Sequence, residues 1–263
     1  MSLGCSVARF AAGTMLAALS TQAFAQEAGA SRLDQVVERK VLNVCTTGDY
    51  RPFSYRPGGA NDFVGIDIDL GRSLAQSLDA EAVFIQTKWS DLLADFQSKC
   101  DIAMSGISVT LPRQREVSFS AMYLVNGKAP IVRCEDVSKY QTIEAINQPA
   151  TRVVVNPGGT NEKFARTKLA DAQIQLFPDN RVIWQEIAEN RADVMVAESV
   201  EVKLQAKLHP GLCAVNPDQP LQYGEMGFLL PRGDTAFKDY VDQWLHLAKA
   251  TGEFDRIFDA NMK

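Results

Sequence analysis

Two glutamates three residues apart form a candidate catalytic pair. Glu198 and Glu201 follow the apolar segment Val194–Ala197, which predicts a buried strand, and begin the helix expected over Val200–Leu208. Acidic residues at a helix start often only cap it or complement its dipole. If cleft closure removes water from both carboxyl groups, burial and mutual repulsion raise at least one pKa, and a proton stays on that group at neutral pH. The pair is then a candidate for acid catalysis, although the helix N-terminus opposes the shift, and both interpretations stay open.

The stretch Asn156–Lys163 is a candidate binding loop. It follows the apolar segment Arg152–Val155 and contains two glycines, which let the backbone approach a ligand closely. The free N–H groups of the helical turn that follows attract an anionic group. Asn156, Thr160 and Asn161 add neutral donors and acceptors, whereas the plain alternative is a strand-to-helix connection with Thr160 as its N-cap. A Walker loop is disfavoured because no Gly-Lys-Ser/Thr follows.

A third group of candidates lies beyond other predicted strand ends. Gly106 and Ser108 can present N–H and hydroxyl donors, and Arg113 offers a planar guanidinium for a carboxylate. Tyr50 and Trp89 could sandwich a flat or apolar ligand body. The alternatives are a surface arginine and ordinary core or rim aromatic residues.

The elements that must position these residues alternate between strands and helices. This alternation predicts a mostly parallel sheet with helices on both faces, and midway along the chain the pattern starts afresh as an inserted second α/β unit. Crossing segments near Val125–Lys128 and Gln222–Glu225 would join a first lobe, residues 26–126 and 223–263, to a second lobe, residues 127–222. Ligands of open α/β sheets bind at strand carboxyl ends, so we expect the site in the cleft between the lobes.

Residues 1–25 read as a signal peptide. Arg9 precedes the apolar stretch Phe10–Leu19, and Ala23-Phe24-Ala25 has the small-x-small form of a cleavage site before Gln26. Cleavage removes Arg9, one of 27 basic residues, and leaves 26 basic and 32 acidic residues. This excess of acidic residues does not favour a basic surface that would bind nucleic acid. No other apolar run is long enough to span a bilayer. We therefore expect a soluble exported protein of the periplasm.

Four cysteines remain after that cleavage, and three complete pairings are possible. Cys45 lies late in one predicted strand and Cys100 just before another, so parallel neighbouring strands would place the two sulfurs at opposite ends. Cys134–Cys213 is therefore the expected disulfide, with Cys45 and Cys100 as buried thiols.

Several other chemistries find no support in the sequence. There is no zinc spacing among the cysteines, and the two histidines, His209 and His246, form neither a metal cluster nor a Ser-His-Asp triad. A dinucleotide fingerprint is also absent. We expect no metal and no organic cofactor.

The order of the motifs resembles the family 3 extracellular solute-binding proteins of amino-acid ABC transporters. The resemblance rests on Thr47–Ser54, Gly65–Leu70 and Asp101–Arg113 and covers nearly the whole mature chain. It implies the α/β type II periplasmic-binding fold, a Venus flytrap of two lobes. More specifically, the chain resembles the cyclohexadienyl dehydratases of this family, which convert prephenate to phenylpyruvate and arogenate to phenylalanine. The longer matches are Thr46–Arg56, Ala103–Ser108, Asn156–Arg166, Leu208–Val215 and Tyr240–His246.

For the first lobe, the resemblance implies a binding role for each candidate. Arg113 matches the carboxylate-binding arginine of the receptors, with Gly106 and Ser108 beside it. Tyr50 and Trp89 match their aromatic walls.

For the second lobe, the resemblance implies both binding and catalysis. Thr160 matches a ligand contact, and Glu198 occupies the position where receptors usually hold the ligand's amino group with Asp. Glu201 matches the general acid of the enzymes, and Asn156 and Asn161 match the asparagines that position it. The implied partner is a small molecule: prephenate, arogenate or an amino acid.

Two departures keep a second hypothesis open. The enzymes have Asp-Ala-Ile-Glu where this chain has Glu198-Ser199-Val200-Glu201, and the chain stops at Lys263 soon after a receptor-like terminal helix. The alternative is an amino-acid receptor without enzymatic activity that delivers cargo to an ABC permease, which leaves Glu201 without a task. A receptor-like sensory module is a third, weaker hypothesis.

Overall fold

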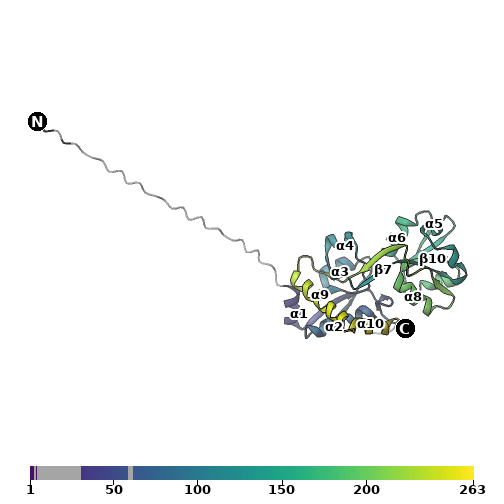
Figure 1. Cartoon of the computed structure of the whole chain (residues 1–263), viewed down its shortest axis with the longest axis horizontal. Helices are drawn as coiled ribbons and strands as arrows, with labels where there is room; N and C mark the ends of the chain where they lie inside the picture. The colour runs from purple at the N-terminus through teal and green to yellow at the C-terminus, as the bar shows by residue number, and fades with distance from the viewer. Residues whose placement is uncertain (3, 5–30, 59–61) are drawn as a thin grey trace.

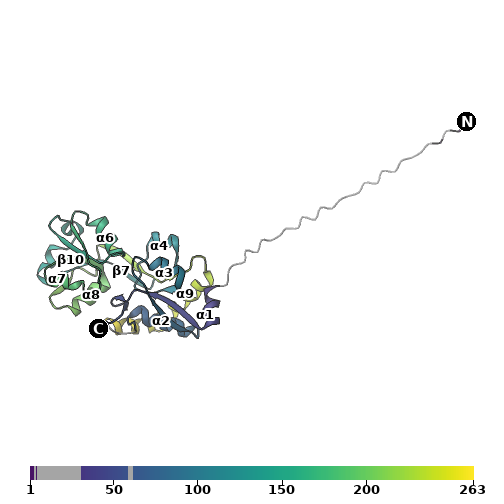
Figure 2. The ribbon, with the colours of Figure 1, turned by 180° about the vertical axis from the view of Figure 1, so that it is seen from behind.

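The computed structural model describes residues 1, 2, 4, 31–58 and 62–263. Apart from Met1, Ser2 and Gly4, the predicted signal peptide lies outside the described residues. Two α/β halves are joined by strands β7 (Leu124–Arg133) and β12 (Gln222–Met226), as Figures 1 and 2 show from opposite sides. These strands pair antiparallel where they cross between the halves.

The first half is built on a five-stranded sheet in the order β4-β1-β5-β13-β6. Strand β1 pairs parallel with β4 and β5, whereas β13, which returns from the second half, pairs antiparallel with β5 and β6. A two-stranded ladder, β2 with β3, lies beside it. The strands are β1 Val41–Thr46, β2 Asp49–Tyr50, β3 Ser54–Tyr55, β4 Glu81–Gln86, β5 Ile102–Ala103, β6 Ser118–Phe119 and β13 Leu229–Leu230; the helices are α1 Arg32–Arg39, α2 Ile66–Ser77, α3 Leu92–Lys99, α4 Leu111–Glu116, α9 Thr235–Ala250 and α10 Glu253–Asn261.

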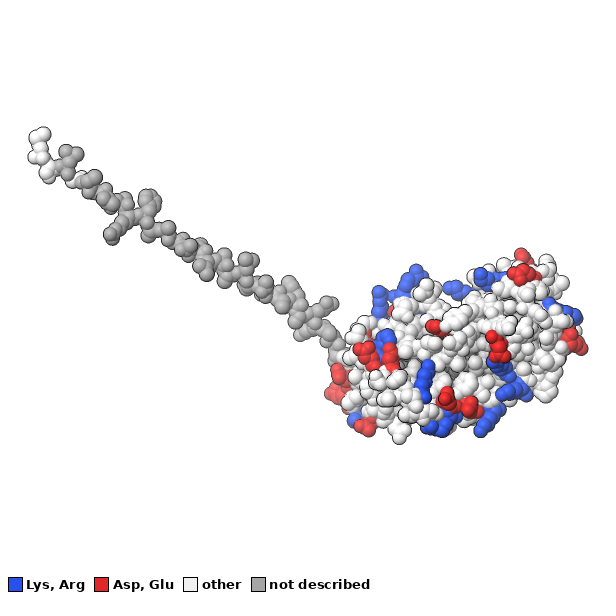
Figure 3. Space-filling view, viewed as in Figure 1, with Lys and Arg blue, Asp and Glu red and all other residues white. Residues whose placement is uncertain are grey.

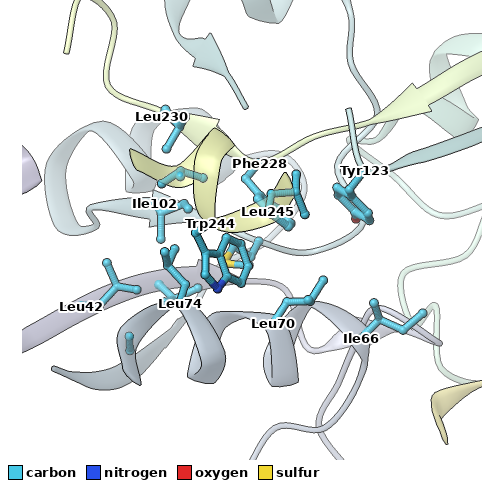
Figure 4. Close-up of a cluster of buried hydrophobic side chains, with 14 of the residues drawn as sticks. Leu42, Ile66, Leu70, Leu74, Ile102, Tyr123, Phe228, Leu230, Trp244 and Leu245 are labelled. Atoms are coloured by element: carbon cyan, nitrogen blue, oxygen red, sulfur yellow. The ribbon is translucent and has the colours of Figure 1, made fainter. Parts of the chain in front are cut away.

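Helices cover both faces of this sheet because alternate strand residues point to opposite faces. On one face, Leu70 and Leu74 of α2 pack with Trp244 and Leu245 of α9, and Leu42 of β1 joins the same cluster (Figure 4). The other face holds a second cluster around α3. Both clusters are almost fully buried, so the first half is a rigid support for the loops at its strand ends.

The second half is built on a sheet in the order β11-β7-β10-β8-β9, and β12 pairs with β7 outside this path. Strand β10 is parallel to β8 and antiparallel to β7. The remaining strands are β8 Arg152–Val155, β9 Gln173–Leu176, β10 Val194–Glu198 and β11 Leu212–Ala214; the helices are η1 Cys134–Lys139, α5 Ile143–Ile146, α6 Thr160–Lys168, α7 Trp184–Ala188 and α8 Ser199–Leu208. The lobe boundaries at 126/127 and 222/223 stay a prediction, because β7 and β12 run through the crossing without a break.

The surface of the described residues is mixed in charge. Basic and acidic side chains are interspersed over the face shown in Figure 3. Among the described residues, no helix combines the length and apolar character needed to cross a membrane.

The predicted disulfide Cys134–Cys213 is present, with Cα atoms 4.8 Å apart. The prediction that Cys45 and Cys100 are thiols is wrong, because the structure joins them in a second disulfide with Cα atoms 5.7 Å apart. Strand β5 begins only at Ile102, and Cys100 is still the C-cap residue of α3. Helix α3 packs on the sheet face that carries Cys45, so its end brings Cys100 over Cys45 and not along the strand.

Replacing both Cys45 and Cys100 by Ala is expected to lower the free energy of unfolding by about 2–4 kcal/mol, because the bridge constrains the unfolded chain. Chemical denaturation of the two proteins measures the difference. Thiol counting on unreduced, denatured protein that begins at Gln26 should find no free thiol; two free thiols would contradict the second disulfide.

Candidate functional site

A small cavity of about 20 Å³, room for about one water molecule, lies between the two halves at the carboxyl ends of their strands. Eight of the ten predicted site residues line it: Tyr50, Trp89, Gly106 and Ser108 from the first half, and Asn156, Thr160, Asn161 and Glu198 from the second. Gly159 and Asn180 complete the lining. The remaining two, Arg113 and Glu201, do not line it.

The cleft is closed. Ser108 Oγ donates a hydrogen bond to Glu198 Oε1 at 2.8 Å, and Asn180 Nδ2 donates to the Asp49 carbonyl at 3.1 Å. The halves also meet where a Cβ atom on Gly158 would lie only 2.8 Å from the backbone nitrogen of Ser90. Gly158 therefore allows an approach that a larger residue would obstruct.

Glu201 is a carboxyl group held almost without water. It lies in the first turn of α8 and is 1 % exposed. Burial raises its pKa well above the ordinary value, and the charge of Glu198 adds to the shift, whereas Lys128 and the backbone N–H of Glu198 oppose it. Its Oε2 atom has no hydrogen-bond partner among the described residues. The carboxyl group thus accepts a hydrogen bond from the helix start and also has a raised pKa, and its role as an acid stays a prediction.

Lys128 is the central cation of the cleft, and the sequence reasoning missed it. Its Nζ atom donates to Glu198 Oε1 at 2.6 Å, Thr160 Oγ1 at 2.9 Å and Asn161 Oδ1 at 2.5 Å. These three acceptors use all the protons of the ammonium group. The signal was a lysine directly before the apolar stretch Ala129–Val132 of strand β7, where the lysine is only 3 % exposed.

The loop before α6 supplies the polar side chains around Lys128. Gly159 is the N-cap of α6 and Thr160 its first residue, so the Thr160 hydroxyl does not cap the helix and instead accepts from Lys128. Asn161 Nδ2 donates to Asn156 Oδ1 at 3.5 Å. Within the described part of the chain, neither asparagine hydrogen-bonds to Glu201, so their predicted role in positioning that acid stays a prediction.

Arg113 lies in α4, behind Ser108. Its Nη1 atom donates to the Ser108 carbonyl at 2.9 Å, and no carboxylate of the described residues lies within ion-pair distance of it. Burial lowers its pKa to about 10, against the favourable charge of Glu198, so the guanidinium stays charged at neutral pH. Its remaining donors can bind a carboxylate.

Two aromatic rings form the wall that the first half contributes to the site. Tyr50 and Trp89 meet edge to face with ring centroids 5.6 Å apart. Burial raises the pKa of Tyr50 well above its usual value, and nearby Glu201 and Glu198 add to the shift, so its hydroxyl remains a donor. Gly106 has φ +62°, and a Cβ atom there would lie 2.6 Å from the Tyr50 ring. Only glycine fits this turn without moving the aromatic wall.

Asp67 holds the turn at Gly106 by a hydrogen bond. Its Oδ2 atom accepts from the backbone N–H of Gly106 at 2.6 Å and from the Tyr123 hydroxyl at 3.1 Å, whereas Oδ1 has no partner among the described residues. Burial raises the pKa of Asp67 to about 7, although both hydrogen bonds oppose the shift. The sequence reasoning used this residue only as part of the Gly65–Leu70 motif.

Asn180 is a further lining residue that the sequence did not indicate. Its Oδ1 atom is buried without a partner among the described residues, as is the Tyr50 hydroxyl. The cleft therefore combines unpartnered donors and acceptors that a polar ligand would satisfy. No group of His, Cys, Asp and Glu side chains in the described ranges is arranged to hold a metal ion.

Comparison with known proteins agrees with this geometry. Residues 42–263 match the bacterial extracellular solute-binding proteins, family 3. A cyclohexadienyl dehydratase of Pseudomonas aeruginosa is 51 % identical over 241 residues, which cover 90 % of this chain and 87 % of the relative. The L-cystine-binding protein of Escherichia coli K12 is 26 % identical over 185 residues, covering 70 % of this chain and 67 % of the relative.

Two solved structures reproduce the architecture. An ancestral amino-acid-binding protein, described as a precursor of cyclohexadienyl dehydratase, superposes with a TM-score of 0.81 at 32 % identity, covering 89 % of this chain and 100 % of its own. A variant ancestral cyclohexadienyl dehydratase has 48 % identity and a TM-score of 0.56, covering 89 % of this chain and 97 % of its own.

The buried carboxyl group of Asp67 predicts a pH-dependent stability. Its pKa is about 7 in the folded chain and near the ordinary 3.8 when unfolded, so the folded state holds the proton between these values. Relative to Asp67→Asn, the wild type should lose about 4 kcal/mol of unfolding free energy as pH rises from about 4 to 7. Denaturation curves of both proteins across this range measure the loss; parallel curves would contradict it.

The Lys128–Glu198 pair predicts a strong coupling. Lys128→Met leaves a buried carboxylate without its cation and should destabilise the fold by about 3–5 kcal/mol. The control is the double variant Lys128→Met/Glu198→Gln, which removes both charges and should recover most of this loss. Urea denaturation of the wild type, the single variants Lys128→Met and Glu198→Gln, and the double variant gives the coupling energy, and additive effects would show that the two side chains do not interact.

Proposed function

Because the chain belongs to the bacterial extracellular solute-binding proteins of family 3, we propose that its closed cleft is the active site of a periplasmic, cofactor-free cyclohexadienyl dehydratase. Family membership confirms the predicted two-lobed α/β fold. The observation that carries the proposal is Glu201, a carboxyl group whose pKa is raised by burial and whose Oε2 atom has no hydrogen-bond partner among the described residues. The 51 % identical dehydratase supports it.

The substrates we propose are prephenate and arogenate. Each is a cyclohexadiene with a ring hydroxyl opposite a carbon that carries a carboxylate and a side chain ending in a second carboxylate. Arg113 binds the side-chain carboxylate, which is retained in the product. A salt bridge to the departing carboxylate would instead stabilise the ground state and slow the reaction. Tyr50 and Trp89 contact each other edge to face, so the substrate ring packs against the wall that they form and not between them.

Glu201 acts as the general acid. Hydroxide leaves carbon slowly, so the proton on Glu201 passes to the ring hydroxyl oxygen as the carbon–oxygen bond breaks and water departs. The bond to the ring carboxylate breaks at the same time, its electron pair enters the ring, and carbon dioxide leaves. The ring becomes aromatic, which supplies much of the driving force. A positioned general acid typically contributes about 10²–10⁴-fold to such a step.

The groups around Glu201 then stabilise its carboxylate. The ammonium group of Lys128 and the backbone N–H of Glu198 both favour the charged form. They lower the cost of ionising the acid at the moment of proton transfer, while burial keeps it protonated beforehand. Asn156 and Asn161 fix Lys128 and the cleft wall through their hydrogen bonds. Glu201 regains its proton from water when the cleft opens and the products leave.

The charge arrangement speaks against the alternative, an amino-acid receptor serving an ABC permease. In a receptor, the acidic residue at position 198 would bind the amino group of the ligand. Here Lys128 occupies Glu198 at 2.6 Å, together with Thr160 and Asn161. The protein supplies its own ammonium group at this place, so the site no longer depends on one from the ligand.

The experiment that tests the proposal is incubation of the purified protein with prephenate and measurement of phenylpyruvate. Glu201→Gln keeps the shape of the side chain but removes the proton donor, so we expect kcat to fall by roughly 10²–10⁴-fold with KM nearly unchanged. Because the acid must be protonated, wild-type kcat should fall as pH rises through the raised pKa of Glu201.

Glu144→Gln is the matched control, since Glu144 also lies in the first turn of a helix, α5, but outside the cleft. It should leave kcat unchanged. Absence of phenylpyruvate together with tight binding of a common amino acid would establish the receptor instead.

A further inference from the structure

Helix α8 begins without help from its own N-cap side chain. Glu198 is the N-cap residue but makes no capping hydrogen bond, because its carboxylate binds Lys128 and Ser108. The first N–H groups of a helix have no partner within the helix. Besides the Glu198 N–H, which Glu201 accepts from, the N–H groups at the start of α8 are open to an acceptor from another part of the chain.

Asn126 of strand β7 supplies this acceptor. Its Oδ1 atom accepts from Ser199 Oγ at 2.6 Å and from the backbone N–H of Val200 at 3.2 Å. Asn126 is 3 % exposed, and its Nδ2 atom contacts Met226 Sδ at 3.5 Å on the other crossing strand. A residue more than 70 positions away in the sequence thus caps the helix that carries Glu201.

The same helical turn is also held by apolar packing. Val200 belongs to the core cluster of the first half, together with Tyr50, Phe53 and Met226. The residue immediately before Glu201 is therefore fixed by a hydrogen bond on its backbone and by packing of its side chain. This restricts the directions that the Glu201 side chain can take.

We infer that Asn126 is a positioning residue that fixes the first turn of α8 and, with it, the place of the Glu201 carboxyl group. Asn126 and Lys128 are two residues apart on β7 and therefore point to the same side of the strand. One strand thus holds both ends of the Glu198–Glu201 turn: Lys128 binds Glu198, and Asn126 binds the two residues between the glutamates. The inference rests on the proposed function, because it gives Glu201 the role of general acid.

The test compares Asn126→Ala with Asn126→Asp, which keeps an acceptor oxygen. We expect Asn126→Ala to lower kcat for prephenate by about 10–100-fold with KM within threefold, since Asn126 does not line the cavity, and Asn126→Asp to stay within tenfold of wild type. In a Glu201→Gln background, Asn126→Ala should cause no further loss of the residual kcat. The matched control is Asn147→Ala, which removes an acceptor of a backbone N–H in the second half away from the cleft.

A second measurement does not depend on turnover. Carbon-13 NMR of protein labelled at glutamate carboxyl groups reports the pKa of Glu201, whose signal is assigned by its loss in Glu201→Gln. Asn126→Ala should lower this pKa by at least one unit toward the ordinary value, because a loosened turn admits water. If wild-type protein forms no phenylpyruvate, the proposed function fails, but this NMR result still tests the positioning.

Three results would overturn the inference. They are an unchanged kcat in folded Asn126→Ala, an equal loss of kcat in the Glu201→Gln background, and an unchanged Glu201 pKa. If Asn126→Ala does not fold, Asn126→Ser replaces it and is judged by the same three results.

Discussion

The electrostatics of the cleft depend on the removal of water from the carboxyl group of Glu201. Glu201 lies at the positive end of a helix and near the ammonium group of Lys128, two influences that favour its ionised form. Burial outweighs both because the two halves meet over the site and exclude solvent. An open cleft would rehydrate the carboxyl group, so its chemistry belongs to the closed state. The raised pKa of Glu201 therefore depends on the closed arrangement of the two halves.

Lys128 organises the polar side of the cleft. It gives Glu198 a buried ion-pair partner at 2.6 Å. Its three hydrogen bonds also tie together β7, β10 and the start of α6, so the polar wall of the second half is fixed before a ligand arrives. Because these side chains are already ordered, ligand binding loses less free energy in ordering them.

Much of this arrangement could be predicted from sequence because it follows from local patterns. Apolar segments indicated the strands, and ligands of such sheets bind at strand carboxyl ends. This rule predicted a shared cavity, and four of the residues that line it are Tyr50, Ser108, Thr160 and Glu198. Contacts set by tertiary structure could not be predicted in this way. The Cys45–Cys100 bridge depends on where α3 ends over the sheet, and the ion pair of Lys128 depends on antiparallel pairing of β7 with β10.

The position of β13 in the first sheet also bears on how the chain reaches its folded state. This strand, Leu229–Leu230, lies between β5 and β6, yet it comes from the last part of the chain. The first half cannot complete its sheet until nearly the whole polypeptide has been made, whereas the strands of the second half are contiguous in the sequence. The sheet of the first half is therefore completed only by residues that are synthesised after the whole second half.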